Sequence, residues 1–471
     1  MLRLKFVAIF LLLAKLSTCH DLNAFDLIHG DLFESHESRA FEEKFITQKL
    51  DQLNIFDDRT WQQRYFSSNQ NYTSGSPILL VLGGEWEARP SVIENGFLGQ
   101  LAANLSAYTI YLEHRFYGQS RPLPDLTLES LSYLTLEQAF EDTAVFVQTL
   151  KNQGFDGKWI LVGASYSAVM ASWARARYPH LYHAAYASGA TVLAVIDIPE
   201  YFEVMGKAFE DTDPNCPLVI QTGMSQLKDL VQRGESATIT SLFNLAEPIN
   251  LFEPDDVYLL YYTVSQVYGL MVQGADPGTL EAKCSALIAG QDTPLQTFAQ
   301  VYNDHINNAS LSVDASKVVE KYQNTNYTRS FIRQWMFQAC TEFGWFNSVF
   351  SPNQPFGPIV PLFFLLKFCT SVYGPEFTSE RLDAGIERTN MLYGGLNPEV
   401  TRVIYTVGSI DPFNPAMLSS DVSADAPTVI IEGGSHCNDL TNPAKPDDPD
   451  SFIDARTKVI ETLAAWLAVD V

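Results

Sequence analysis

The sequence is short of basic residues and of long apolar stretches, and both shortages exclude classes of protein. Its 471 residues include 30 Lys and Arg against 55 Asp and Glu, which gives a formal net charge of −25. Such a surface repels nucleic acid and anionic lipid, so we expect no nucleic-acid partner. The most apolar stretches, residues 6–14 and 361–368, are far shorter than the roughly 20 residues of a bilayer-spanning helix. We therefore expect no stable membrane insertion.

Cysteine is scarce, and metal-binding spacings are missing. The six cysteines and eight histidines form no C-x-x-C or H-x-x-x-H pattern, so we expect no metal and no cofactor. Cys19 falls in a predicted leader, which leaves five cysteines. An odd number in an oxidising compartment implies one free or intermolecular thiol. The simplest arrangement pairs Cys216 with Cys284 and Cys340 with Cys369, and leaves Cys437 over.

The first 19 residues have the three-part pattern of a secretory signal peptide. A basic start at Arg3 and Lys5 precedes the apolar run, and small residues up to Cys19 offer a cleavage position. We predict residues 1–19 as the signal peptide and residues 20–45 as an N-terminal arm or pro-segment. The mature protein is then expected in the secretory pathway, either secreted or in the endosomal or lysosomal lumen.

Four N-x-S/T sequons agree with this compartment and predict surface positions that carry glycans. Three-residue patterns also arise by chance, so we expect most of the four to be used rather than all. The sequons begin at Asn71, Asn104, Asn308 and Asn326.

Apolar periodicity divides the chain into an α/β part and a helical part. Strand-like runs alternate with helical patterns over residues 46–198 and again over residues 386–471, which predicts a mostly parallel sheet. Amphipathic helical stretches dominate residues 199–385. We therefore predict an α/β domain in two segments with a large inserted helical domain. The predicted elements are strands at 77–82, 107–112, 159–162, 184–188, 403–407 and 428–431, and helices at 136–150, 169–178, 201–209, 257–272 and 452–467.

The predicted strand at 159–162 leads through the sequence GASYS into a helix. A nucleophile elbow holds its serine in a strained turn, so the residues two before and two after the serine must be small. Gly163 and Ser167 satisfy this requirement. The turn would expose the Ser165 hydroxyl, and the amide of Tyr166 at the helix start would face an oxyanion. Ser165 is therefore the candidate nucleophile.

A serine nucleophile needs a histidine base and an acid behind that base, and in open-sheet hydrolases the chain order is serine, acid, histidine. His436 alone among the eight histidines follows a late predicted strand, and Asp411 follows the strand before it. Gly84 or the adjacent Glu85 follows an early strand, where a second oxyanion amide is expected. Each residue alone also fits an ordinary turn. The three types in this order favour a catalytic set of Ser165, Asp411 and His436.

Several blocks of sequence resemble the S28 serine peptidases, a family that contains lysosomal Pro-X carboxypeptidase, dipeptidyl peptidase 2 and thymus-specific serine protease. The resemblance covers nearly the whole mature chain and is strongest to the thymus-specific branch. It rests on residues 48–51, 83–85, 113–120, 163–168, 178–181, 338–345, 411–412 and 435–437.

The resemblance implies an α/β-hydrolase fold whose inserted helical domain roofs the site. It implies peptide hydrolysis, often at acidic pH and often after proline. Matched by motif, Ser165 is the nucleophile, Asp411 the orienting acid and His436 the base. The resemblance also supports the bridge between Cys340 and Cys369. It gives residues 113–115 a structural role beneath the site.

The chain departs from the family pattern near the nucleophile. Ala164 and Ala168 stand where the family elbow usually has glycine, and both are small enough to be accommodated. Trp86 stands where glycine usually follows Gly-Gly-Glu, so an indole would reshape the pocket beside the oxyanion loop. We take Glu85 and Trp86 as candidate substrate-binding residues, because a carboxylate there could bind a free amine.

We predict a serine-type peptidase that hydrolyses peptides through an acyl-enzyme, as an exopeptidase with a preference for proline implied by the resemblance. The alternatives are an esterase or lipase on the same fold and an inactive hydrolase-fold binding protein. The sequence leaves open carboxypeptidase, dipeptidyl and internal cleavage. It leaves open a monomer or a homodimer as well.

Overall fold

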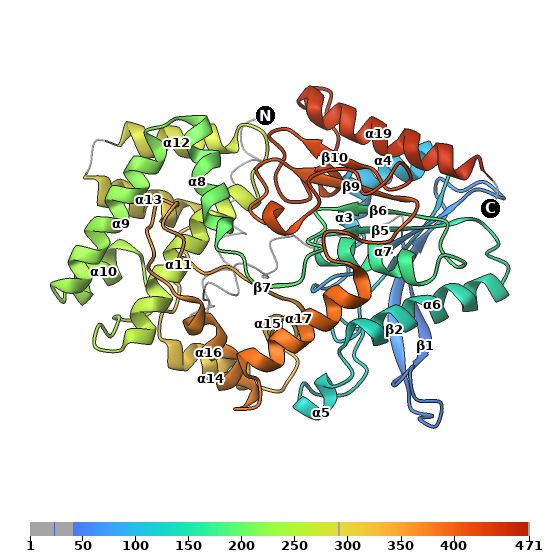
Figure 1. Cartoon of the computed structure of the whole chain (residues 1–471), viewed down its shortest axis with the longest axis horizontal. Coiled ribbons are helices and arrows are strands. Elements are labelled where there is room, and N and C mark those ends of the chain that lie inside the picture. The colour runs from blue at the N-terminus through green and yellow to red at the C-terminus, as the bar shows by residue number, and fades with distance from the viewer. Residues whose placement is uncertain (1–22, 24–40, 291–292, 470–471) are drawn as a thin grey trace, which may run out of the picture.

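The computed structural model describes residues 23, 41–290 and 293–469. It has two parts, a central β-sheet covered by helices and a separate group of helices beside it (Figure 1). The sheet part is built from the early and late segments of the chain, and the helical part from the middle. This arrangement confirms the predicted α/β-hydrolase fold with a large inserted helical domain.

Eight strands of the described chain form the main sheet, in the order β1-β2-β4-β3-β5-β6-β9-β10. β1 and β2 form an antiparallel hairpin, β2 is antiparallel to β4, and the remaining neighbours are parallel. Parallel pairing requires helical crossovers, which cover both faces of the sheet. The strands are β1 (Glu42–Lys49), β2 (Thr60–Ser68), β3 (Ile78–Leu82), β4 (Tyr108–Leu112), β5 (Trp159–Ala164), β6 (Ala184–Ser188), β9 (Val403–Gly408) and β10 (Thr428–Ile431).

Successive side chains of the central strands enter two different cores. In β3, Leu80 packs with residues of α6 and α7, whereas Leu79 and Val81 pack with residues of α4 and α19. Successive residues of a strand point to opposite faces, so a strand that is apolar at every position is buried on both sides. The helices of this part are α3 (Ser91–Asn95), α4 (Phe97–Asn104), α5 (Leu128–Leu131), α6 (Leu136–Asn152), α7 (Tyr166–Arg177), η2 (Asn414–Ala416), α18 (Asn438–Thr441) and α19 (Asp450–Leu467).

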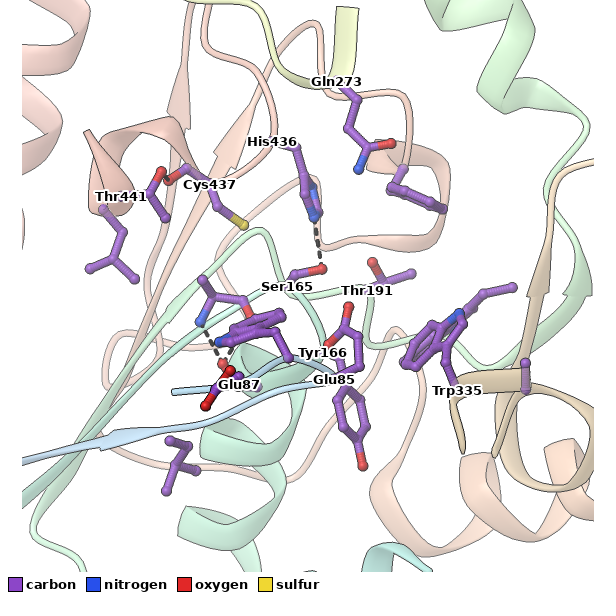
Figure 2. Close-up of a pocket in the computed structure, with 18 of the residues that line it drawn as sticks. Glu85, Glu87, Ser165, Tyr166, Thr191, Gln273, Trp335, His436, Cys437 and Thr441 are labelled. Atoms are coloured by element: carbon purple, nitrogen blue, oxygen red, sulfur yellow. Dashed lines mark hydrogen bonds between the residues drawn. The ribbon is translucent and has the colours of Figure 1, made fainter. Parts of the chain in front are cut away.

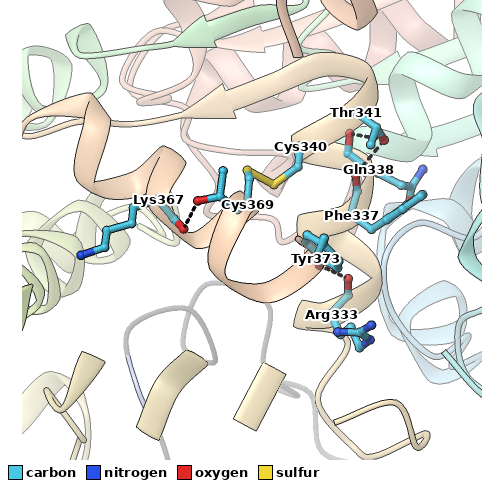
Figure 3. Close-up of a disulfide and its surroundings, with 9 residues drawn as sticks. Arg333, Phe337, Gln338, Cys340, Thr341, Lys367, Cys369 and Tyr373 are labelled. Atoms are coloured by element: carbon cyan, nitrogen blue, oxygen red, sulfur yellow. Dashed lines mark hydrogen bonds between the residues drawn. A yellow bond between two sulfur atoms is a disulfide. The ribbon is translucent and has the colours of Figure 1, made fainter. Parts of the chain in front are cut away.

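Two disulfides hold the inserted part together, and both confirm the predicted pairing. Cys216 is bonded to Cys284, and Cys340 is bonded to Cys369 (Figure 3). Cys437 is the free, buried cysteine of the described chain. The inserted elements are α8 (Glu200–Thr212), α9 (Cys216–Gln232), α10 (Ser236–Leu242), α11 (Pro254–Gln273), α12 (Thr279–Ala289), α13 (Pro294–His305), α14 (Ala315–Gln323), α15 (Ile332–Gln338), the π-helix η1 (Ala339–Phe343), β8 (Gly344–Phe346), α16 (Leu362–Tyr373) and α17 (Ser379–Tyr393), with β7 (Val195–Asp197) paired to β8.

Three predicted boundaries differ from the observed elements. β1 begins at Glu42, inside the predicted arm at 20–45, because its mostly exposed edge position carries polar residues that hide the strand pattern. The predicted end of the insert at residue 385 falls inside α17, which continues to Tyr393. The helix predicted from residue 169 begins at Tyr166, because Ser165 itself occupies the N-cap position. The predicted signal peptide lies outside the described residues.

The surface of the described chain is compatible with the predicted glycosylation. The side chains of Asn104, Asn308 and Asn326 are exposed, and that of Asn71 is partly exposed. Glycan attachment requires such accessible positions, and use of the four sequons stays a prediction. No helix within the described ranges has both the length and the apolar character needed to cross a bilayer.

The 113–115 block is buried beneath the site and carries paired charges. Glu113 accepts hydrogen bonds from Arg64 Nε at 3.2 Å and from Ser120 Oγ at 2.8 Å. Arg115 Nε donates to Asp142 Oδ2 at 2.6 Å, and both of these side chains are fully buried. Buried ions persist only when they are paired and hydrogen-bonded. The contacts agree with the structural role that the resemblance implies for this block.

A further buried carboxyl joins the insert to the sheet part. Glu342 Oε1, in η1, accepts a 2.9 Å hydrogen bond from the backbone N–H of Leu136, the first residue of α6. Burial raises the pKa of Glu342 to about 8, from an ordinary value of 4.5. The folded protein therefore retains a proton at this carboxyl that the unfolded chain releases at lower pH.

We expect the free energy of unfolding to fall as the pH rises from about 5 to about 8, because folding must return to the buried Glu342 a proton that the unfolded chain has released. Glu342→Gln keeps the shape and the acceptor oxygen but cannot ionise, so it should remove on the order of a few kcal/mol of this pH dependence. Urea unfolding at both pH values measures it. Glu387→Gln, at an exposed carboxyl, is the matched control. Equal slopes in Glu342→Gln and the wild type would contradict the expectation.

Candidate active site

Ser165 lies in a strained turn between β5 and α7. Its backbone has φ 56° and ψ −126°, which an L-residue adopts only when its surroundings enforce it. Its N–H donates to the carbonyl of Ser188, at the end of β6, at 2.9 Å. A Cβ on Gly163 would come within 2.1 Å of the Ser167 carbonyl oxygen, so that position has room only for glycine. The elbow geometry explains the small residues found on both sides of the serine.

The structure brings Ser165, His436 and Asp411 together. His436 Nε2 lies 2.8 Å from Ser165 Oγ, and His436 Nδ1 lies 2.7 Å from Asp411 Oδ2 (Figure 2 draws the first of these contacts). Asp411 follows β9 and His436 follows β10, and these strands are parallel neighbours. The ends of adjacent parallel strands meet at one edge of the sheet, which places the acid and the base side by side.

The electrostatic surroundings of His436 suit a general base held by an acid. Asp411 is fully buried, and its Oδ1 accepts a 2.9 Å hydrogen bond from the backbone N–H of Phe413. Burial opposes the imidazolium, but the charge of Asp411 raises the pKa of His436 well above its ordinary 6.5. With Asp411 ionised, Nδ1 must donate to it. In the neutral imidazole Nε2 is then free to accept the proton of Ser165.

Two loops adjoin Ser165 at the positions expected for oxyanion donors. Tyr166 is the first residue of α7, and the first amides of a helix have no partner within the helix. Gly84 and Glu85 follow β3, the strand paired to β5. The indole of Trp86 folds over Gly84, where a Cβ would meet the ring at 2.6 Å. The missing side chain of Gly84 therefore leaves the space that the indole of Trp86 occupies.

A cavity of about 310 Å³ opens above Ser165 and His436. One wall comes from the sheet part, including Glu85, Trp86 and Arg89. In the view of Figure 2, Trp335, from the inserted helices, lies beyond Glu85 and Thr191 as seen from Ser165. Trp86 is fixed in place, because its Nε1 donates to the hydroxyl of Tyr111 at 2.8 Å. Inserted residues that complete the opposite wall are Tyr262, Gln273, Trp335, Met336, Trp345, Phe346 and Asn347.

Glu85 is the buried acid of this cavity. Its side chain is 7 % exposed and lies beside Thr191 and Ser165 (Figure 2). Burial raises the pKa of Glu85 to about 7, against the opposing charge of His436. Both sequence-predicted pocket residues, Glu85 and Trp86, thus line the cavity.

The sequence pattern did not identify Arg89 or the inserted aromatic residues as part of the site. Arg89 lies in a loop without any motif of its own. Trp345 stands in the 338–345 block that carries the family resemblance, yet its place in the cavity depends on the pairing of β7 with β8. Such long-range contacts leave no local signal in one sequence.

Comparison with known proteins gives one consistent family. The model of the family described as Serine carboxypeptidase S28 matches residues 48–459. A putative serine protease, K12H4.7 of Caenorhabditis elegans, is 30% identical over 454 residues, which cover 90% of this chain and 87% of that protein. The thymus-specific serine protease of Mus musculus is also 30% identical, with the same coverage of 90% and 87%.

More distant matches include proteins that are named for a peptidase activity. The lysosomal Pro-X carboxypeptidase of Mus musculus is 23% identical and covers 91% of this chain and 90% of that protein. Among solved structures, a proline iminopeptidase of Mycobacterium smegmatis is 12% identical, with a TM-score of 0.35, over 91% of this chain and 99% of that chain. Since the family model spans most of the sequence, the chain belongs to the S28 serine peptidases and is a serine-type peptidase.

Proposed function

We propose that the chain hydrolyses peptides through a Ser165–His436–Asp411 acyl-enzyme mechanism. The observation that carries the proposal is the relay of 2.8 Å and 2.7 Å contacts through His436. His436 takes the hydroxyl proton as Ser165 forms a bond to the peptide carbonyl carbon, and Asp411 stabilises the imidazolium. The C–N bond then breaks, and His436 gives its proton to the leaving amine. Water activated by His436 releases the acyl group from Ser165.

Backbone amides of Tyr166 and of the Gly84–Glu85 loop are the proposed oxyanion donors. Their support is their position at the start of α7 and after β3, on either side of the nucleophile. Donors fixed in advance need no reorganisation as negative charge develops on the carbonyl oxygen.

The charges in the cavity favour a carboxypeptidase among the exopeptidases. Arg89 is the one arginine or lysine among the described residues that line the cavity, and an arginine stays charged at every physiological pH. The candidate for binding a free amine, Glu85, is held mostly protonated below a pKa of about 7 by burial, and Glu87, which also lines the cavity, already accepts a 2.9 Å hydrogen bond from Arg64 Nη2. In an acidic lumen a terminal carboxylate would therefore find a charged partner more readily than a terminal amine would. The aromatic wall with Trp335 and Trp345 offers flat surfaces for an apolar residue such as proline.

The compartment of this activity is proposed as the lumen of the secretory pathway or of lysosomes. Two disulfides support an oxidising site of folding. Three exposed sequon asparagines, at positions 104, 308 and 326, are compatible with glycosylation there.

Ser165→Ala and His436→Ala should each lower kcat by roughly 10⁶-fold while the protein stays folded, because each removes the nucleophile or its base. The purified protein is incubated at about pH 5 and pH 7 with peptides that have free or blocked ends, and mass spectrometry identifies the products. Ser420→Ala, at an exposed serine, is the control. Serine-dependent release from simple esters, without cleavage of any peptide, would instead indicate an esterase.

Arg89→Gln should raise KM for peptides with a free C-terminal carboxylate by about tenfold or more, because a charge-assisted hydrogen bond is lost. The same peptides with a C-terminal amide should change little. Glu85→Gln is the matched control in the same cavity and should not distinguish the two peptide sets. A selective loss of activity on peptides with a free N-terminal amine in Glu85→Gln, with no effect of Arg89→Gln, would change the assignment to a dipeptidyl peptidase or aminopeptidase.

A further inference from the structure

The side chain of Tyr166 reaches away from the nucleophile and into the inserted part. It is 2 % exposed, and its ring contacts the rings of Trp335, Phe343 and Trp345 at centroid distances between 5.6 and 6.5 Å. All three partners belong to α15, η1 or β8 of the insert. The residue that follows the nucleophile is thus held by a different part of the fold from the one that carries Ser165.

The hydroxyl of Tyr166 lies between two polar side chains. Gln338 Nε2 donates to it at 2.8 Å, and His114 Nε2 lies 3.3 Å from it. His114 Nδ1 is 2.7 Å from the carbonyl oxygen of Arg115, which can only accept, so Nδ1 carries the proton. Burial lowers the pKa of His114 to about 4, so the ring is neutral and Nε2 is an acceptor. The Tyr166 hydroxyl therefore accepts from Gln338 and donates to His114.

Gln338 is fixed in one orientation. Its Oε1 accepts a 2.8 Å hydrogen bond from the hydroxyl of Tyr117, which leaves Nε2 to donate to Tyr166. The side chain is completely buried. Gln338 ends α15, two residues before the disulfide between Cys340 and Cys369 (Figure 3). The amide that holds Tyr166 is therefore anchored in a cross-linked segment of the insert.

We propose that Gln338 is a positioning residue for catalysis, because its hydrogen bond to the Tyr166 hydroxyl fixes the backbone amide that receives the oxyanion. The proposal rests on the proposed roles of Ser165 and Tyr166. Side chain and amide belong to one residue at the first position of α7, so a side chain that is held at its far end restrains the Cα and the backbone that carries the amide. The insert then contributes to transition-state binding in addition to closing the cavity.

Two variants remove this contact with little change of shape. Tyr166→Phe deletes the hydroxyl and keeps the ring, and Gln338→Met deletes both polar atoms and keeps the length. Each should lower kcat about tenfold with KM nearly unchanged, a smaller loss than the 10²–10³-fold typical of removing an oxyanion donor outright. The loss should be equal for a peptide and for a small p-nitrophenyl ester, because an oxyanion effect does not depend on substrate length. The double variant should lose no more than either single variant.

Tyr182→Phe is the control for loss of a buried hydroxyl. The Tyr182 side chain is fully buried, and its hydroxyl has no hydrogen-bond partner among the described residues. Rates are expressed per active site, titrated to completion with a fluorophosphonate, and melting temperatures check folding. A kcat within twofold of wild type in Tyr166→Phe, or a loss confined to the longer peptide, would overturn the proposal. Activity that survives Ser165→Ala would instead overturn the proposed function on which it rests.

Discussion

The strained backbone of Ser165 is the constraint on which the rest of the site depends. A residue at φ 56° and ψ −126° costs on the order of 1–3 kcal/mol, so the surrounding structure must enforce it. Gly163 allows the helix to fold back against the strand, and the carbonyl of Ser188 holds the serine N–H. The strain directs the hydroxyl toward His436 and at the same time places the start of α7 beside it. A larger residue at 163 would push α7 away from β5, because its Cβ would collide with the Ser167 carbonyl oxygen. The hydroxyl of Ser165 and the start of α7 would then no longer be held side by side.

Burial determines the charge states of the acidic residues in and near the cavity. The inserted helices cover Ser165 and His436, which stay partly exposed at the cavity, whereas Asp411 is fully buried, so its charge acts on the imidazole from a medium of low polarity. Burial also raises the pKa of Glu85 and of Glu342 and favours their neutral forms. A neutral Glu85 adds no negative charge to oppose the developing oxyanion. Mildly acidic surroundings therefore suit the fold, whereas proton transfer from Ser165 requires the neutral form of His436, whose pKa Asp411 raises.

The sequence predicts the parts of this structure that local patterns define. The apolar strands β5, β6, β9 and β10 and the amphipathic helices α6 and α11 match their predicted ranges closely, because burial of a whole strand or of one helical face leaves a clear period. Ser165, Asp411 and His436 could be identified because each follows the end of a predicted strand, in the chain order that hydrolases use. β1 and β2 were missed because both strands carry many polar residues, β1 at the edge of the sheet and β2 next to it. Arg89 and Gln338 were missed because their partners lie far away in the sequence.

The insert contacts the proposed catalytic residues from two sides, which restricts how a substrate can enter. The backbone N–H of His436 donates to the carbonyl of Gln273, at the end of α11, at 3.3 Å, and Asn438 Nδ2 donates to the carbonyl of Ala275 at 2.9 Å. On the other side of the cavity, Gln338 holds Tyr166. A hinge motion that lifted the insert as a lid would break both sets of contacts and disturb the base and the nucleophile together. This arrangement supports the proposed exopeptidase activity, because a substrate that enters through the mouth of the cavity without lifting the insert would present the end of a chain more easily than an internal loop of a folded protein.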